Sequence, residues 1–106
     1  MSAAQHTQFP KFPLGQTCLT AGVNDLAVQE GLAFLSAIKV LFLRHMCGDW
    51  GDVCDDDKQV NDAALKHGGR ILSSYELTDS REKAHKVWII TEADRSVTTM
   101  LFPSEY

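Results

Sequence analysis

The segment from Lys86 to Phe102, KVWIITEADRSVTTMLF, constrains the fold more than any other part of the chain. It contains two apolar, β-rich runs separated by a short polar stretch, which is the pattern of a β-hairpin with a loop of about four to five residues. Val87 to Ile90 are consecutive large apolar residues, so we expect this strand to be covered on both faces. The pattern therefore predicts an antiparallel ribbon at the end of the chain.

Two further stretches are predicted to be strands. Arg70 to Leu77 alternates between its two faces with the period of a strand, and Leu14 to Leu19 alternates weakly. Residues 1–13 are polar and interrupted by prolines, so we expect a flexible N-terminal tail. A chain of 106 residues is long enough for one domain, which we place at residues 14–106.

Three helices are expected between these strands. A short one follows Thr20 and ends at Gly31, the longest runs from Leu32 to Met46, and the third runs from about Asp55 to His67. The sequence thus predicts an α+β domain. Its sheet is expected to be antiparallel and three- to four-stranded, with two to three helices packed on one face.

The longest helix is apolar nearly all round. One face is expected to cover the sheet, while Leu32, Val40 and Leu43 fall on the other side, where a surface helix normally carries charge. Such a helix is either buried between two layers or used in association. In a domain this small we expect association, through self-association or with an unknown protein partner. Burial beneath the tail or a neighbouring helix is the alternative.

The composition limits the classes of partner that this protein is expected to bind. The net charge of −4 and a pI near 5.4 argue against nucleic acid, although four basic residues of one third of the chain allow a local patch. No apolar signal segment begins the chain, and the longest apolar run is too short to cross a bilayer, so we expect a cytoplasmic protein without membrane contact. The four basic residues are Arg70, Arg81, Lys83 and Lys86.

No metal or cofactor is expected. Cys18, Cys47 and Cys54 match no zinc spacing and are expected to be free thiols in a reducing compartment. The aspartates between Gly48 and Asp57 fail the register of a calcium-binding EF-hand loop, and helix capping accounts for most of them.

Two sets of polar residues are candidates for a functional surface. Near the end of the longest helix, His45 lies close to Asp49 in sequence, so it is either a general base or a structural residue at the helix terminus. In the hairpin loop, Glu92, Asp94 and Arg95 form either an anion clamp or ordinary turn contacts.

The sequence resembles one family of small proteins found on bacterial plasmids, prophages and integrated elements and usually described as plasmid-related. The resemblance covers about residues 14–106. It rests on the motif RHxxGDWGD from Arg44 to Asp52, on the run WIITEADRS from Trp88 to Ser96, and on a C-terminal PxEY. This chain departs from the pattern at residues 32–43 and 79–85.

The resemblance implies a mobile-element setting and directs attention to seven polar or aromatic motif positions. The expected function is a non-enzymatic accessory protein that binds another protein, and inhibition of that protein is one form that the binding could take. The alternative is a small hydrolase or nuclease that uses His45 with Asp49 and Arg95. The seven positions are Arg44, His45, Asp49, Trp50, Glu92, Asp94 and Arg95.

Overall fold

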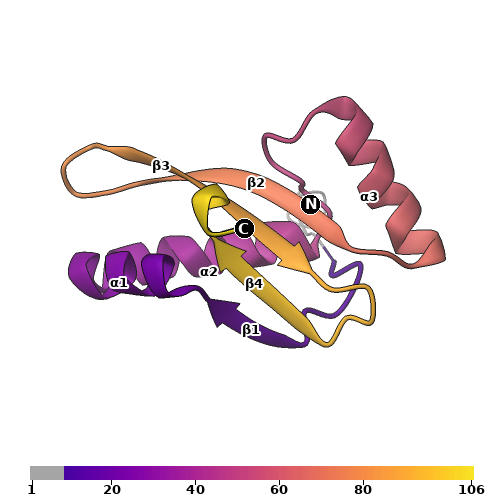
Figure 1. The fold of residues 1–106 in the computed structure, drawn as a ribbon, viewed down its shortest axis with the longest axis horizontal. Helices are drawn as coiled ribbons and strands as arrows, with labels where there is room; N and C mark the ends of the chain where they lie inside the picture. Colours follow the sequence, from indigo (N-terminus) through magenta and orange to yellow (C-terminus); the bar gives the residue numbers. More distant parts are fainter. Residues whose placement is uncertain (1–8) are drawn as a thin grey trace, which may run out of the picture.

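The structure is a computed structural model that describes residues 9–106. Within this range the chain has the α+β class predicted from the sequence, and both the long helix and the C-terminal hairpin are present (Figure 1). In chain order the elements are β1 (Gln16–Leu19), α1 (Ala21–Glu30), α2 (Leu32–Met46), α3 (Asp55–His67), β2 (Ile71–Thr78), β3 (Ala84–Thr91), β4 (Val97–Leu101) and the 3-10 helix η2 (Pro103–Glu105).

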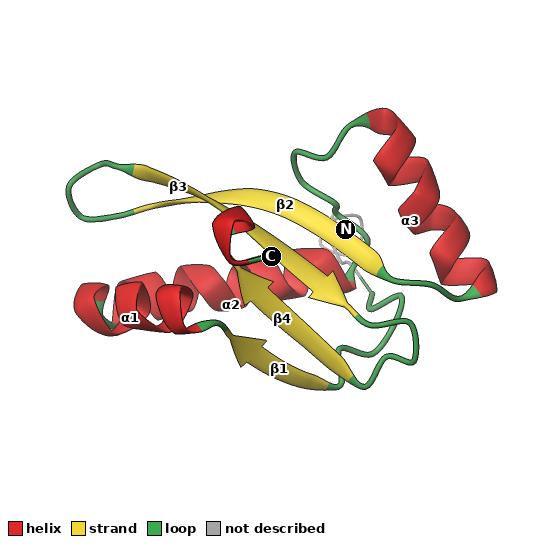
Figure 2. Cartoon of the chain, in the orientation of Figure 1, coloured by secondary structure: helices red, strands yellow, loops and turns green. Residues whose placement is uncertain are grey.

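The four strands form one mixed sheet in the order β1-β4-β3-β2 (Figure 2). β3 pairs antiparallel with both β2 and β4, and Ile89 lies opposite Ser73 on one side and Met100 on the other. β1 runs parallel to β4, so the prediction of an antiparallel sheet is wrong at this strand. A short, weakly alternating strand carries no sequence signal for its direction. The parallel pairing continues past β1, where the N–H of Thr20 bonds the carbonyl of Met100 (3.1 Å).

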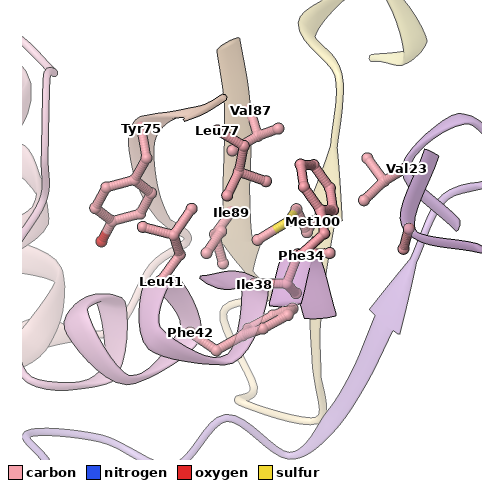
Figure 3. Packing of buried hydrophobic residues seen from close by; sticks show 11 residues of the cluster. Val23, Phe34, Ile38, Leu41, Phe42, Tyr75, Leu77, Val87, Ile89 and Met100 are labelled. Atoms are coloured by element: carbon pink, nitrogen blue, oxygen red, sulfur yellow. The ribbon is translucent and has the colours of Figure 1, made fainter. Parts of the chain in front are cut away.

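The main core lies between the sheet and the helices α1 and α2, which cover one of its faces (Figures 1 and 2). The buried residues of α2 recur every three or four positions, as the predicted inward face requires. They meet the alternate residues of the strands, which point to the same side. Figure 3 shows these side chains: Val23, Phe34, Ile38, Leu41, Phe42, Tyr75, Leu77, Val87, Ile89 and Met100.

The third helix, α3, lies beside the edge strand β2 rather than over the sheet face (Figure 1). Its buried residues are only Asn61 and Ala64, so its apolar surface is too small to cover a sheet. The side-chain amide of Asn61 bonds the backbone N–H and C=O of Leu72 (3.1 and 2.8 Å). This side chain therefore satisfies the edge of β2 as a neighbouring strand would.

The N-terminal segment crosses the end of α2. Of the 13 residues predicted as a flexible tail, residues 1–8 lie outside the described part of the chain, but Phe12 is buried. Lys11 donates its N–H to the carbonyl of Met46 (2.9 Å), and the Phe12 ring lies 5.3 Å from that of His45. The packed domain therefore begins before residue 14.

The C-terminal segment caps α1. Thr20 precedes this helix as predicted, but its hydroxyl donates to Glu105 Oε1 (2.6 Å) instead of capping the helix itself. Glu105 Oε2 accepts the N–H of Gly22 (3.0 Å), which places a carboxylate at the positive end of the helix dipole. The bond from Thr20 is the main cause that lowers the pKa of Glu105.

Candidate functional site

A chain of hydrogen bonds crosses the core from α2 to the N-terminal segment. His45 Nδ1 lies 2.5 Å from Ser73 Oγ on β2, and its Nε2 lies 2.8 Å from Thr91 Oγ1 on β3. Thr91 Oγ1 lies 2.7 Å from Thr98 Oγ1 on β4, and the Thr98 hydroxyl donates to the carbonyl of Leu14 (2.7 Å). All four side chains are buried, so this chain fastens α2 to three strands.

The carbonyl of Leu14 is the last acceptor in this chain of hydrogen bonds, and it determines which group donates at each step. A carbonyl can only accept, so the single hydroxyl proton of Thr98 goes to Leu14. Thr98 must then accept from Thr91, and Thr91 must accept from His45 Nε2–H. His45 Nδ1 remains as an acceptor for the hydroxyl of Ser73. His45 is therefore the neutral Nε2–H tautomer, and both ring nitrogens are occupied.

This environment gives no support to His45 as a general base. Burial lowers the pKa of His45 to about 3, because the cationic ring would lose its hydration. A base that acts near neutral pH needs a pKa close to the working pH and contact with the substrate. The His45 side chain is 0% exposed. Its role in the structure is to link the helix to the sheet.

The loop after α2 closes back on the helix through Asp49. Asp49 Oδ2 accepts from Arg44 Nε (2.7 Å) and Oδ1 accepts from the N–H of Gly51 (3.1 Å). The bond from Arg44 is the main cause that lowers the pKa of Asp49. The Tyr75 hydroxyl donates to the carbonyl of Asp49, and the Arg44 guanidinium lies 4.8 Å from the centre of the Tyr75 ring. Each of these groups therefore holds the loop against β2.

Trp50 and Gly51 join this loop to the edge of β2. The carbonyl of Trp50 accepts from the N–H of Ser74 (3.2 Å), and the carbonyl of Ser74 accepts from the N–H of Asp52 (2.7 Å). The buried indole of Trp50 donates to Asp62 Oδ1 on α3 (3.0 Å). Gly51 has φ +72°, and a Cβ atom there would overlap the carbonyl oxygen of Ser74. The motif GDWGD thus forms a short addition to the sheet edge.

Arg95 joins the β3–β4 loop to the end of α3. Its Nη2 donates to the carbonyl of Ala64 (3.0 Å), and its Nη1 donates to the carbonyl of Gly69 (2.6 Å). Nη1 also lies 3.1 Å from the carbonyl oxygen of Glu92. The cation therefore meets main-chain acceptors at the negative end of a helix. These contacts leave Arg95 engaged within the fold rather than facing an anion.

Glu92 and Asp94, on the same loop, also have partners. Glu92 Oε1 lies 3.4 Å from Arg70 Nε, and both side chains are close to half-exposed. Asp94 Oδ1 accepts from the N–H (3.0 Å) and the hydroxyl (2.6 Å) of Ser96, and the bond from that hydroxyl is the main cause that lowers the pKa of Asp94. The bonds of Asp94 to Ser96 are turn contacts, whereas the partner of Glu92, Arg70, lies outside the loop.

Residues from both candidate sets, the one near the end of α2 and the one in the β3–β4 loop, lie around Phe12 in the structure. The guanidinium carbon of Arg95 lies 5.7 Å from the centre of the Phe12 ring, and the rings of His45 and Trp50 lie 5.3 and 6.2 Å from it. We call the region of the seven motif residues the motif end of the molecule. Its centre is an aromatic contact between elements.

The sequence reasoning missed Phe12, Ser73, Thr91 and Thr98 as members of this region. Ser73 and Tyr75 are two residues apart in a strand and share one face, so a polar residue at an inward position is a usable signal for a buried hydrogen bond. Phe12 is an aromatic residue in a polar, proline-containing stretch, and the sequence does not decide whether it packs on the domain or belongs to a flexible tail.

The outer side of α2 has a different character. Leu32 is 82% exposed, Val40 is 53% exposed and Leu43 is 54% exposed, and Ser36 lies exposed between them. We call these four residues the outer stripe of α2. At about 100° per residue they fall within an arc of about 80° on the helix. Three of the four stripe residues are apolar, and the exposed Lys39 lies at its border.

Several other kinds of site find no support in residues 9–106. In this range no three His, Cys, Asp or Glu side chains gather as a metal site would need, and no helix has the length and apolar character to cross a membrane. Among the basic residues considered for nucleic acid, Arg70 lies beside Glu92 and Lys86 lies opposite Glu76 in the strand register. A local basic surface is thus partly neutralised.

Comparisons of the chain with family models, with curated proteins and with solved structures find no match. The resemblance to plasmid-related proteins therefore stays a prediction. The candidate function rests on the geometry of the chain itself.

Proposed function

We propose that this protein is a non-enzymatic accessory protein of a mobile genetic element, and that it acts by binding another protein through the outer stripe of α2. The mobile-element setting comes from the sequence resemblance alone. The observation that carries the binding proposal is the exposure of Leu32, Val40 and Leu43 on one side of a single helix.

The size and position of the stripe support a docking role. A helix of 15 residues is about 22 Å long, which is enough for several successive turns to contact a partner. Surface helices normally place charged side chains where these apolar ones lie. Contiguous exposed apolar patches on soluble proteins often mark interaction sites.

The state of the motif end supports the same assignment by contrast. Arg95 donates to main-chain carbonyls, Arg44 and Asp49 bond each other, and His45 is buried and neutral. Glu92 lies beside Arg70, and Asp94 accepts from Ser96. If the motif end were an active site, at least one of these side chains would have to face a substrate. The binding proposal needs none of them.

Capture from an extract of host cells carrying the element tests the proposal with matched variants. Val40→Asp places a charge in the stripe, and Val60→Asp places the same charge on α3, where Val60 is 61% exposed. We expect the wild type and V60D to retain the same protein and V40D to lose it. The captured protein would then be purified, and its affinity for each variant measured by calorimetry. Equal affinity for all three would refute the proposal.

A further inference from the structure

We infer that β1 is a docking edge for a second copy of this chain, whose own β1 pairs with it antiparallel about a twofold axis at Cys18. The two four-stranded sheets then form one continuous sheet. This contact uses the edge of the sheet and not the outer stripe of α2, so it is independent of the proposed function. The two edges of the sheet, at β2 and at β1, differ in a way that supports it.

The edge at β2 is closed by other parts of the chain. Asn61 bonds the outward main-chain groups of Leu72, and the GDWGD loop bonds those of Ser74. The next outward residue of the strand is Glu76, which is exposed. A charged side chain on an edge strand discourages pairing with another chain. This edge is therefore protected at three successive outward positions.

The edge at β1 lacks this protection. Gln16 and Thr20 donate their N–H groups to the carbonyls of residues 96 and 100 (3.0 and 3.1 Å). Main-chain groups alternate in direction along a strand, so those of Thr17 and Leu19 point away from β4. Within residues 9–106 these outward N–H and C=O groups have no hydrogen-bond partner. β1 forms the outer border of the sheet (Figure 2), and its sequence QTCL contains no charge and no proline.

A second copy of β1 supplies what these four groups need. When two antiparallel strands are centred on Cys18, Thr17 of each copy lies opposite Leu19 of the other. Residues opposed in this way exchange two hydrogen bonds, so four bonds form and every outward group of β1 is used. Each contact occurs twice, as a twofold interface requires. Every copy carries the same unprotected edge, so the matching strand is always present at the concentration of the protein itself.

The ends of the strand select this register. A pair centred on Thr17 would place Leu19 opposite Gly15, which has φ +65° and lies outside β1. A pair centred on Leu19 would place Thr17 opposite Ala21, which is the first residue of α1. Only the pair centred on Cys18 keeps all of the bonded residues within β1, and it brings no two charges together.

The shortness of β1 limits the strength of the contact. The strand has four residues, and short edge strands are one way in which proteins restrict such pairing. Two strands of this length also bury less area than a standard interface does. We therefore expect a weak dimer, with a dissociation constant on the order of 100 μM.

Sedimentation equilibrium of the full chain between about 10 and 500 μM tests the inference with two variants of one exposed residue. Thr17→Pro removes an N–H that points away from β4, so it opposes the second copy and keeps the pairing inside the chain. Thr17→Val keeps the N–H and the preference for a strand. We expect T17P to weaken the dimer at least tenfold and T17V to change it less than twofold. Circular dichroism checks that both variants are folded.

Disulfide formation tests the register and does not depend on the folding of T17P. In the pair the two Cys18 Cα atoms lie about 4.5 Å apart, within the range of a disulfide. Cys47→Ser and Cys54→Ser leave Cys18 as the single thiol of the chain. Diamide then oxidises two thiols to one disulfide by accepting two electrons and two protons.

The matched control adds Thr17→Cys and Cys18→Ser to this chain. The two copies of position 17 lie on the diagonal of the pair, beyond about 7 Å, where a disulfide does not form. Thr17 is more exposed than Cys18, so random collisions would favour the control. We expect Cys18 to form the disulfide dimer at least tenfold faster than the control does.

Several outcomes would overturn the inference. A wild type that stays monomeric at every concentration leaves β1 without a second copy. A dimer that T17P leaves unchanged uses another surface, and a control that oxidises as fast as Cys18 shows another register. If the wild type is monomeric and T17P loses the protein captured from host extract, the edge takes a strand of that protein instead. The proposed function is tested separately, by V40D.

Discussion

The motif end, to which α2 contributes only Arg44 and His45, and the outer stripe of α2 use their side chains in opposite ways. At the motif end, His45 is buried with both ring nitrogens bonded, and Arg95 donates to carbonyls of α3 and of the segment that follows it. On the outer stripe, Leu32 and Val40 are more than half-exposed. The polar residues whose types suggest catalysis thus stabilise the fold, whereas the apolar residues of the outer stripe face solvent.

The difference has a physical origin. This small domain carries α3 at the edge of its sheet, where little apolar surface is available for packing. Directional contacts replace that missing area: an asparagine side chain satisfies one strand edge and an arginine holds the helix end. Groups used in this way are desolvated and occupied, so they are poorly placed for catalysis. Substitutions should therefore separate the two regions, with stability effects at one and binding effects at the other.

The largest effect is expected at Gly51. Gly51→Ala would force a Cβ atom onto the carbonyl of Ser74 at φ +72°, so both steric overlap and backbone strain act against the folded state. We expect a loss of about 5 kcal/mol in the free energy of unfolding, measured by urea denaturation, or failure to fold.

Gly68→Ala is the matched control for this substitution. Gly68 has φ +85°, but no atom lies within 4 Å of the added Cβ, so only the backbone strain of about 1–3 kcal/mol remains. Equal losses for the two variants would show that the edge contact of Gly51 contributes nothing.

The second effect is a dependence of stability on pH that comes from His45. The folded protein keeps this ring neutral down to about pH 3, whereas in the unfolded chain it takes up a proton near pH 6.5. Below pH 6.5 the unfolded state therefore binds more protons, and stability falls as the pH drops. The full loss is on the order of 4 kcal/mol at pH 3, of which about 2 kcal/mol appears by pH 5.

Urea denaturation at pH 7.5, 6 and 5 measures this dependence. His45→Asn keeps a donor and an acceptor but cannot be protonated, so we expect it to be less stable at pH 7.5 and to lose less between pH 7.5 and 5. Nitrogen NMR of the wild type should also find the Nε2–H tautomer of His45 throughout this range. A doubly protonated ring at pH 5 would contradict the buried hydrogen-bond chain.

A smaller effect is expected for Arg95→Lys. Lysine keeps the charge but cannot reach the carbonyls of Ala64 and Gly69 together, because it lacks the planar fork of arginine. We expect a loss of about 2 kcal/mol in unfolding free energy and earlier hydrogen exchange at the end of α3. Lys66→Arg, at an exposed position of the same helix, serves as the control and should change little.

Periodicity explains how much of this architecture was predictable. The long helix, its inward face and the C-terminal hairpin follow from repeats of 3.6 and 2 residues that extend over many positions, so the signal is strong. The direction of β1 was not predictable, because four exposed or half-buried residues carry no signal for their partner. The placement of α3 depends on Asn61, whose side chain imitates a strand, and helix patterns do not encode such a contact.

The candidate site was harder to predict for a related reason. The polar residue types at the motif end are compatible with a catalytic role and with a structural role. Only the hydrogen-bond partners of these residues distinguish the two roles. Those partners, such as Ser73 for His45 and Ala64 for Arg95, come from distant parts of the chain. The exposure of Leu32, Val40 and Leu43 followed from the helix period alone, which is why that part of the sequence analysis agrees with the structure.

The smallest effect on stability is expected at the outer stripe itself, and it completes the comparison. Val40 is 53% exposed, so Val40→Asp removes little buried apolar surface from the monomer. We expect a change of less than about 0.5 kcal/mol, measured by urea denaturation below the concentration at which any dimer forms, and a similar change for Val60→Asp. A loss of more than about 2 kcal/mol in V40D would mean that the stripe packs within its own chain. The two regions would then both be structural, and the binding proposal would lose the observation that carries it.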